Sequence, residues 1–320
     1  MVIEIKHRYL EVNGLRMRVA EAGTGPLVLL LHGFPECWYS WRHQLRALAE
    51  AGFRAVAPNQ RGYPGTDSPS EVADYTMLHL VGDMIGLISA LGEQSATVIG
   101  HDWGAPVAWH TALLRPDKVR GVAGLSVPPS RRSDTPPLSA LRTRYGSDFY
   151  QLYFQQAGVE ADFEADLDKT FRRLLYGISG DHPEINKLQV PDGSSFLDIW
   201  SDPVRLPDWL TETDVQTYVS TFADSGFTGP LNWYRNIDRN WALTAPWHGA
   251  PITPPAMVLV GNRDPVVAAF DLDRLARSVH RFVPNLRGFE VIPGAGHWIQ
   301  QERPEVVNAT LIDFAAATAP

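Results

Sequence analysis

Residues 98–105 read VIGHDWGA, and they join a run of β-branched residues to a segment with helical spacing. Two glycines, Gly100 and Gly104, flank the central Asp102, so the backbone can turn sharply between the two elements without a Cβ clash. Such a turn would hold the Asp102 side chain above the end of the strand. A surface turn in which the aspartate caps a helix would give the same pattern. Residues elsewhere in the chain must therefore show which of these two turns is present.

The segments around this turn alternate between strands and helices. The continuous apolar run PLVLLLHG (26–33) predicts a strand buried on both faces, and residues 38–52 and 76–92 have helical spacing and end at glycine. The dipeptide Asn13-Gly14 predicts a hairpin near the N-terminus. This alternation predicts an α/β fold, with a mostly parallel central sheet and helices on both faces.

The alternation stops in the middle of the chain. Residues 130–248 contain aromatic-rich helical segments without a buried strand run, and proline-rich stretches bound them on both sides. The α/β pattern then returns, with strands expected over 256–264 and 288–293 and a helix between them over about 268–280. We therefore expect one α/β core, formed by residues 1–129 and 249–320, with residues 130–248 inserted as a helical cap or lid.

Composition narrows the class of protein. The 320 residues carry a net charge of −8, which disfavours a nucleic-acid partner. The single cysteine, Cys37, excludes an internal disulfide, and no apolar run reaches the length of a membrane span. The charged N-terminal stretch has no apolar core of a signal peptide. We expect a cytoplasmic protein.

Two further residues support a catalytic interpretation of Asp102. Asp264 ends one predicted strand in VGNRDPVV, and His297 follows another in PGAGHW. The order nucleophile, acid, histidine resembles the catalytic triad of α/β-hydrolases, whose elbow normally carries serine at the position of Asp102. A turn aspartate and a structural histidine are the alternatives, but three such residues at strand ends, where ligands bind in open α/β sheets, favour a shared site.

The stretch LHGFPE (31–36) predicts the fourth part of such a site. An oxyanion hole needs backbone N–H groups directed at developing negative charge. We expect one from Trp103, directly after the nucleophile, and one from Phe34. Pro35 would fix this loop, either through a cis peptide bond or as an ordinary proline turn.

Six motifs give the chain a close resemblance to soluble epoxide hydrolases of the α/β-hydrolase superfamily: HGFPECWYSWRHQ, QRGYPGTDSP, GHDWGA, DFYQLYFQQAGVEAD, SGFTGPLNWYRN and GHWIQQERP. The resemblance implies that epoxides and water become vicinal diols through an ester on Asp102, without a cofactor or metal. It implies a small apolar epoxide from xenobiotic or lipid sources as substrate, and it leaves a homodimer open.

The resemblance also implies proton donors on the cap. In that family two tyrosines hold the epoxide oxygen, and the matching motifs place them at Tyr150 and Tyr234, with Tyr153 as a neighbour that could be confused with Tyr150. Packing between cap helices is the alternative role for these rings. Further substrate contacts are expected from His32, Pro35, Phe149, Gln151, Trp233 and Trp298.

The chemistry explains an aspartate at the elbow. A carboxylate can displace at saturated carbon as an anion, whereas serine would first need deprotonation. A haloalkane dehalogenase shares this nucleophile, but a halide needs N–H donors instead of acids, and Phe34 offers only its backbone N–H. A non-catalytic ligand receptor on the same fold is the second alternative.

Overall fold

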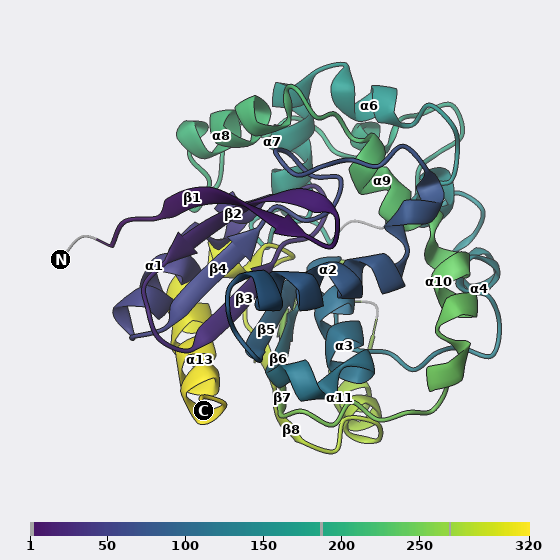
Figure 1. The fold of residues 1–320 in the computed structure, drawn as a ribbon. Coiled ribbons are helices and arrows are strands. Elements are labelled where there is room, and N and C mark those ends of the chain that lie inside the picture. Colours follow the sequence, from purple (N-terminus) through teal and green to yellow (C-terminus); the bar gives the residue numbers. More distant parts are fainter. Residues whose placement is uncertain (1–2, 186–187, 269) are drawn as a thin grey trace.

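The computed structural model describes residues 3–185, 188–268 and 270–320, and a single eight-stranded sheet forms its centre (Figure 1). The strand order is β1-β2-β4-β3-β5-β6-β7-β8. The strands are β1 (Lys6–Val12), β2 (Leu15–Ala22), β3 (Leu27–Leu31), β4 (Arg54–Pro58), β5 (Ala96–His101), β6 (Val119–Leu125), β7 (Ala256–Gly261) and β8 (Leu286–Ile292). In this spatial order, all strands from β4 through β3 to β8 run parallel, and β1 and β2 form the antiparallel edge. The predicted hairpin is present, with Asn13 and Gly14 both at positive φ.

Helices cover both faces of the sheet. One face carries α1 (Arg42–Glu50) and α13 (Pro304–Ala317), and the other carries α2 (Met77–Ala90), α3 (Gly104–Leu114) and α11 (Leu272–His280). In strand β3, alternate side chains point to opposite faces of the sheet and pack into two different cores. Val28 and Leu30 pack into the core beneath α1 and α13, whereas Leu27, Leu29 and Leu31 pack into the core on the opposite face. The predicted doubly covered sheet is confirmed.

A helical cap, the segment from α4 to α10, is inserted between β6 and β7. Its helices are α4 (Pro137–Tyr145), α5 (Tyr150–Tyr153), α6 (Glu160–Glu164), α7 (Leu167–Gly177), α8 (Glu212–Phe222), α9 (Thr228–Arg235) and α10 (Ile237–Leu243). Figure 1 shows these helices in teal and green, arching over and beside the sheet. The inserted cap agrees with the sequence pattern, and its boundaries at residues 130 and 248 stay a prediction.

Two predicted helices begin differently from the sequence estimate. The helix expected over 38–52 starts as a 3₁₀ turn, Trp38–Trp41, before α1 begins at Arg42. The helix expected from about residue 268 begins only at Leu272, where the Asp271 side chain accepts the Arg274 N–H as an N-cap. In the part of the chain that the structure describes, no helix is both long and apolar enough to cross a membrane.

Candidate active site

The turn at Asp102 is as sharp as the sequence predicts. Asp102 has a φ of 47°, and it connects β5 directly to α3. A Cβ on Gly100 would lie 2.0 Å from the Gly104 carbonyl oxygen, and a Cβ on Gly104 would lie 2.0 Å from the Leu31 carbonyl oxygen. Because backbone atoms fill both spaces, only glycine fits on either side of the aspartate. A left-handed conformation at a non-glycine residue is a sign of a functional constraint.

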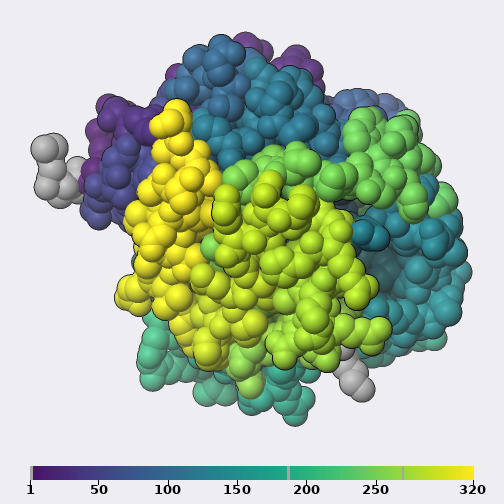
Figure 2. Space-filling view, turned by 90° about the horizontal axis from the view of Figure 1, so that it is seen from below, coloured from purple at the N-terminus to yellow at the C-terminus, as the bar shows by residue number. Residues whose placement is uncertain are grey.

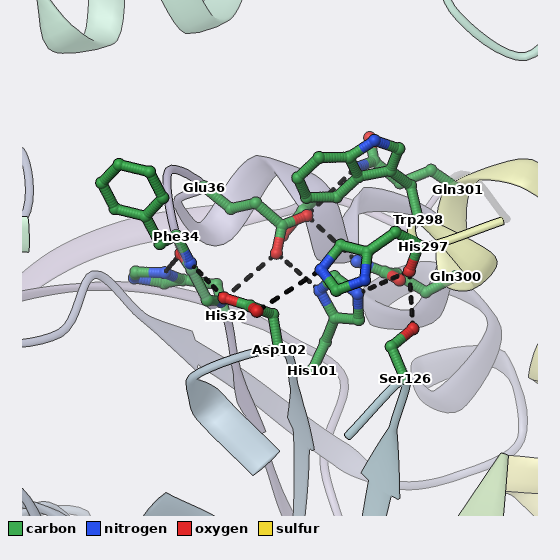
Figure 3. Close-up of polar contacts among 12 residues, drawn as sticks. His32, Phe34, Glu36, His101, Asp102, Ser126, His297, Trp298, Gln300 and Gln301 are labelled. Carbon is green, nitrogen blue, oxygen red and sulfur yellow. Dashed lines mark hydrogen bonds and ion pairs between the residues drawn. The ribbon is translucent and has the colours of Figure 1, made fainter. Parts of the chain in front are cut away.

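Three predicted residues meet at the carboxyl ends of the strands (Figure 3 shows two of them). His297 Nε2 lies 3.4 Å from Asp102 Oδ2, and His297 Nδ1 lies 3.0 Å from Asp264 Oδ2. The second carboxylate oxygen of Asp264 accepts the Val266 N–H at 2.8 Å. His297 and Asp264 are buried, so the imidazole is held between two carboxylates in a region with little water.

Burial and charge oppose each other at this triad. Burial alone would lower the pKa of His297, but the Asp264 and Asp102 carboxylates outweigh it and raise the pKa well above 6.5. Burial alone would raise the pKa of Asp102, but the hydrogen bond and charge of His297 lower it below the usual value. The free protein therefore holds an ionised Asp102 beside a protonated His297 at neutral pH.

The loop after β3 supplies a backbone donor to Asp102. The Phe34 N–H donates to Asp102 Oδ1 at 2.7 Å, and a Cβ on Gly33 would lie 2.3 Å from the same oxygen. The Phe34–Pro35 peptide is cis, one of the two alternatives open from the sequence. The second predicted donor, the Trp103 N–H, has no hydrogen-bond acceptor within the described segments and precedes the first turn of α3.

A buried polar network behind this loop has no counterpart in the sequence prediction (Figure 3). The Glu36 carboxylate lies 2.7 Å from His101 Nδ1 and accepts the Gly33 N–H at 3.2 Å. His101 Nε2 lies 2.7 Å from the backbone oxygen of His297. The side-chain amides of Gln300 and Gln301 donate to the other Glu36 oxygen. One carboxylate thus links three segments. They are the loop after β3 (residues 32–36), which we call the oxyanion loop, the turn at Asp102, and the segment around His297, which we call the histidine loop.

A second buried carboxylate, Glu302, links the histidine loop to the cap. It accepts the backbone N–H groups of Gly180, Gly296 and Trp298 at 2.8 to 3.0 Å. The His297 N–H donates to the cap carbonyl of Ile178 at 2.9 Å. The position of the histidine therefore depends on both the core and the cap.

The cap closes the site with aromatic side chains. Asp102, His297, Phe34, Tyr150 and Tyr234 line one narrow cavity of about 30 Å³. The remaining lining is mostly apolar: Phe154, Leu174, Ile178, Leu188, Phe196, Trp200, Pro265 and Val266. The carboxylate and the two phenols therefore line the same narrow and mostly apolar cavity.

The structure separates Tyr150 from its neighbour Tyr153. Tyr150 lines the cavity, whereas the Tyr153 hydroxyl donates to Asp162 and does not line it. Burial raises the pKa of both Tyr150 and Tyr234 above 10, and the nearby Asp102 charge adds to this. The Gln151 side chain donates to the Tyr150 hydroxyl at 2.9 Å. Both phenols are therefore protonated donors at neutral pH.

The other predicted contact residues fall into two groups. Phe149 and Gln151 line a neighbouring pocket that shares Tyr150, Leu188 and Val266 with the cavity. Pro35 lies in the oxyanion loop and is buried, and it does not line the cavity.

The remaining three lie behind the cavity wall. His32 accepts the Gln60 N–H at Nε2, and burial lowers its pKa to about 4. Trp233 donates to a backbone oxygen at Arg61 and packs against Trp103. Trp298 donates to a backbone oxygen in α7 and packs edge-on against His297. These side chains support residues that face the cavity.

Metal ligands are not clustered here. Across residues 3–185, 188–268 and 270–320, no group of three or more His, Cys, Asp or Glu side chains is arranged to hold an ion. The one cysteine, Cys37, is buried, and burial raises the pKa of its thiol to about 12. The reactive groups of the site are therefore carboxylates, one imidazole and two phenols.

Comparison with known proteins places this geometry in a family. Residues 26–304 match the model of the alpha/beta hydrolase fold. The chain is 42% identical to Epoxide hydrolase A of Mycobacterium tuberculosis over 313 residues, which cover 96% of each protein. The chain belongs to the epoxide hydrolases of the alpha/beta hydrolase fold. This epoxide hydrolase is also 42% identical to Epoxide hydrolase 3 of Siraitia grosvenorii, over 97% of the chain and 98% of the relative.

Solved structures of epoxide hydrolases agree over the same length. The structure of Epoxide Hydrolase A from Mycobacterium thermoresistibile superposes with a TM-score of 0.92 at 46% identity, and the match covers 98% of both chains. An epoxide hydrolase from Vigna radiata gives 0.91 at 39% identity, again over 98% of both. Core and cap are therefore shared across the whole length with these enzymes.

Proposed function

We propose that this epoxide hydrolase opens small apolar epoxides by direct attack of Asp102, and that water then releases the diol from the resulting ester. One observation carries the proposal. An ionised carboxylate on the core and two protonated phenols on the cap face each other across one apolar cavity. The carboxylate can attack a carbon of the epoxide, while the two phenols contact the epoxide oxygen.

In the first step, a carboxylate oxygen of Asp102 forms a bond to an epoxide carbon. The carbon–oxygen bond of the ring breaks, and the departing oxygen takes a proton from Tyr150 or Tyr234. An alkoxide is a much stronger base than a phenolate, so a phenol that stays neutral before the reaction is a suitable acid. The burial that raises the phenol pKa values keeps this proton in place until the ring opens.

In the second step, His297 takes a proton from water, and the hydroxide attacks the ester carbonyl carbon of Asp102. The N–H groups of Phe34 and Trp103 stabilise the oxyanion. The Phe34 N–H already lies 2.7 Å from Oδ1 in the free protein. Collapse releases the diol. Its departing alkoxide takes the proton of the Asp102 carboxylic acid, and His297 keeps the proton from water, so the enzyme returns to ionised Asp102 and protonated His297. Water and epoxide are the only net reactants.

The charge on Asp102 sets the timing of His297. In the free enzyme two carboxylates raise the His297 pKa, so the ring is protonated and cannot act as a base. Ester formation removes one of these two charges, and the His297 pKa falls accordingly. His297 then gives its proton to the phenolate left by ring opening, which restores the phenol and makes His297 the base of the second step. Asp264 remains to orient the ring and stabilise its cation.

Halide release is the rival reaction for an aspartate nucleophile. A departing halide needs neutral or cationic N–H donors and takes no proton. Here the cavity presents two phenols opposite Asp102, and the Trp103 indole interacts with the Tyr234 hydroxyl. The donor set suits a leaving oxygen.

A panel of aryl and alkyl epoxides, assayed beside matched haloalkanes, tests this reaction class. We expect vicinal diols without added metal or cofactor and no halide release. Release of halide without diol from any epoxide would overturn the proposal. All proposed catalytic groups come from one chain, so a homodimer is not required. The cytoplasmic location stays a prediction from the sequence.

A further inference from the structure

The proposed reaction leaves the buried carboxylate of Glu302 without a role. Glu302 is 5% exposed and ends α12 (Ile299–Glu302), a short helix that starts two residues after His297. Burying a carboxylate is costly unless hydrogen bonds or charges compensate for the lost water. The partners of Glu302 therefore show which groups the fold holds in place beside the histidine.

Three backbone N–H groups surround this carboxylate. Its Oε2 accepts the N–H of Gly180 at 2.9 Å and the N–H of Gly296 at 2.8 Å. Its Oε1 accepts the Trp298 N–H at 3.0 Å. Burial raises the pKa of Glu302, while the three N–H groups and, to a smaller extent, the charge of Arg303 oppose this shift. Three donors around two oxygens need a group that only accepts, and the ionised carboxylate is such a group.

One oxygen of Glu302 joins the cap to the histidine loop, and the two backbones touch at this point. A Cβ on Gly296 would lie 2.1 Å from the Gly180 nitrogen, and a Cβ on Gly180 would lie 2.2 Å from the Gly294 oxygen. Figure 2 shows teal residues of the cap against the yellow-green residues that precede the C-terminal helix. We call this contact between residues 178–180 and residues 294–298 the clasp.

The clasp holds the backbone of His297 by its N–H side. The residues before and after the histidine, Gly296 and Trp298, both donate to Glu302. His297 itself donates to the Ile178 carbonyl of the cap at 2.9 Å. Three consecutive N–H groups are thus fixed by one carboxylate and one carbonyl, while groups of the core bind the His297 carbonyl. The clasp therefore sets the direction in which the imidazole leaves the backbone.

The cap side of the clasp also forms part of the cavity wall. Ile178 lines the active cavity together with His297, and Leu174 lines it one helical turn earlier. The Trp298 indole donates to the Leu175 carbonyl in the same helix, α7, at 2.9 Å. The clasp therefore fixes the imidazole relative to the wall that confines the substrate.

The groups that open the ring are held elsewhere. The Asp102 carboxylate accepts the Phe34 N–H, and Tyr150 and Tyr234 belong to α5 and α9. The three N–H groups that Glu302 accepts belong to none of these residues. A disturbed clasp would therefore displace the base of the second step and leave the nucleophile and both acids of the first step in place.

We infer that Glu302 is a positioning residue for ester hydrolysis, which ties the cap to the histidine loop and so holds His297 within reach of the attacking water. The inference rests on the proposed function. Glu302 itself contacts neither water nor ester, and it acts through the backbone of residues 296–298. The cap thereby takes part in both steps, through the two tyrosines in ring opening and through the clasp in hydrolysis.

Glu302→Gln tests this role, because it keeps the size of the side chain and removes its charge. The amide oxygen can still accept the two glycine N–H groups, but the NH₂ group then faces the Trp298 N–H, which loses its acceptor. Single turnovers of an aryl epoxide are followed by rapid quench and intact-protein mass spectrometry. We expect ring opening within about twofold of wild type and ester hydrolysis about tenfold slower, the effect of weakened hydrogen bonds to a charged group. The ester should then accumulate.

Trp209→Phe is the matched control. The Trp209 indole donates to the Ser179 hydroxyl at 3.1 Å, so this variant removes one hydrogen bond from the cap segment of the clasp and none from Glu302 or His297. Both steps should keep their wild-type rates. If Glu302→Gln does not fold, Glu302→Asp replaces it with the same expectation, because its carboxylate is one carbon too short to reach all three N–H groups.

A measurement without substrate separates the two proposals. The proton between His297 Nδ1 and Asp264 Oδ2 should give a downfield proton NMR signal, assigned by its loss in Asp264→Asn. We expect this signal to shift in Glu302→Gln and to stay in place in Trp209→Phe.

Equal slowing of both steps, unchanged rates of both, or an unmoved signal in Glu302→Gln would overturn the role of Glu302. A wild-type enzyme that forms diol without any ester would instead overturn the proposed reaction. The NMR signal would then still decide whether Glu302 positions His297.

Discussion

The two walls of the active cavity are built by different interactions. On the core wall, hydrogen bonds fix each group: Asp102 accepts from Phe34, and His297 is held by Asp264. On the cap wall, ring contacts dominate, and Tyr234 packs edge-on against both Phe34 and Trp103. The comparison teaches that charged groups need directed partners in a dry site, whereas neutral acids need only a position and an apolar surrounding.

The largest expected effect comes from breaking the cap wall. Replacing Tyr150 and Tyr234 together by phenylalanine keeps the ring packing and removes both acids. We expect turnover to fall by about 10²–10⁴-fold, with smaller losses in the single variants because one phenol partly replaces the other. Steady-state diol formation measures this.

Tyr153→Phe is the matched control for the cap variants. Tyr153 belongs to the same helix, α5, but its hydroxyl is bonded to Asp162 and not to the cavity. It should retain near wild-type turnover. A double variant as active as this control would mean that Tyr150 and Tyr234 serve only in packing.

An intermediate effect comes from titrating the core wall. Asp102 stays ionised well into acid because its pKa is lowered, so ring opening persists as the pH falls. Ester hydrolysis needs neutral His297, whose neutral fraction falls about tenfold for each pH unit below its pKa in the ester. The fraction of enzyme trapped as ester should therefore rise as the pH falls, measured by rapid quench and mass spectrometry. A trapped fraction that rises with pH would contradict the assigned order of events.

The smallest expected effect lies where a directed contact reaches the cap wall. Gln151→Leu removes the donor to Tyr150 but leaves the phenol in place. We expect a loss of roughly two- to tenfold in kcat, the size of one modest hydrogen bond. Gln156→Leu, at an exposed position of the same segment, is the control and should show no change. Equal rates for both variants would show that packing alone positions Tyr150.

The groups that belong to local motifs could be predicted from the sequence. Asp102, Asp264 and His297 each follow a strand, and a parallel sheet brings such ends together. The glycine pattern at the elbow has a steric cause that any backbone of this shape would impose. These features follow from local rules, which explains why the fold class and the triad geometry could be predicted.

Other features depend on contacts between distant segments. Glu36 meets His101 across 65 positions, and the sequence offers no local signal for that pair. In short helices rich in aromatic residues, the spacing of these residues does not show which ring faces the cavity. Phe154 and Trp200 line the cavity, whereas Trp233 lies behind its wall. Side-chain direction in the cap is set by tertiary packing.

The most direct test of the central claim is intact-protein mass spectrometry of His297→Gln mixed with an epoxide. Without its base, the enzyme should still open the ring and then stall at the ester. The account predicts one added substrate mass per chain, which maps to the peptide that contains Asp102. In wild-type enzyme turning over in heavy-oxygen water, the label should enter the Asp102 carboxylate. No adduct and no label, in enzyme that still forms diol, would mean that Asp102 activates water directly and never bonds to the substrate.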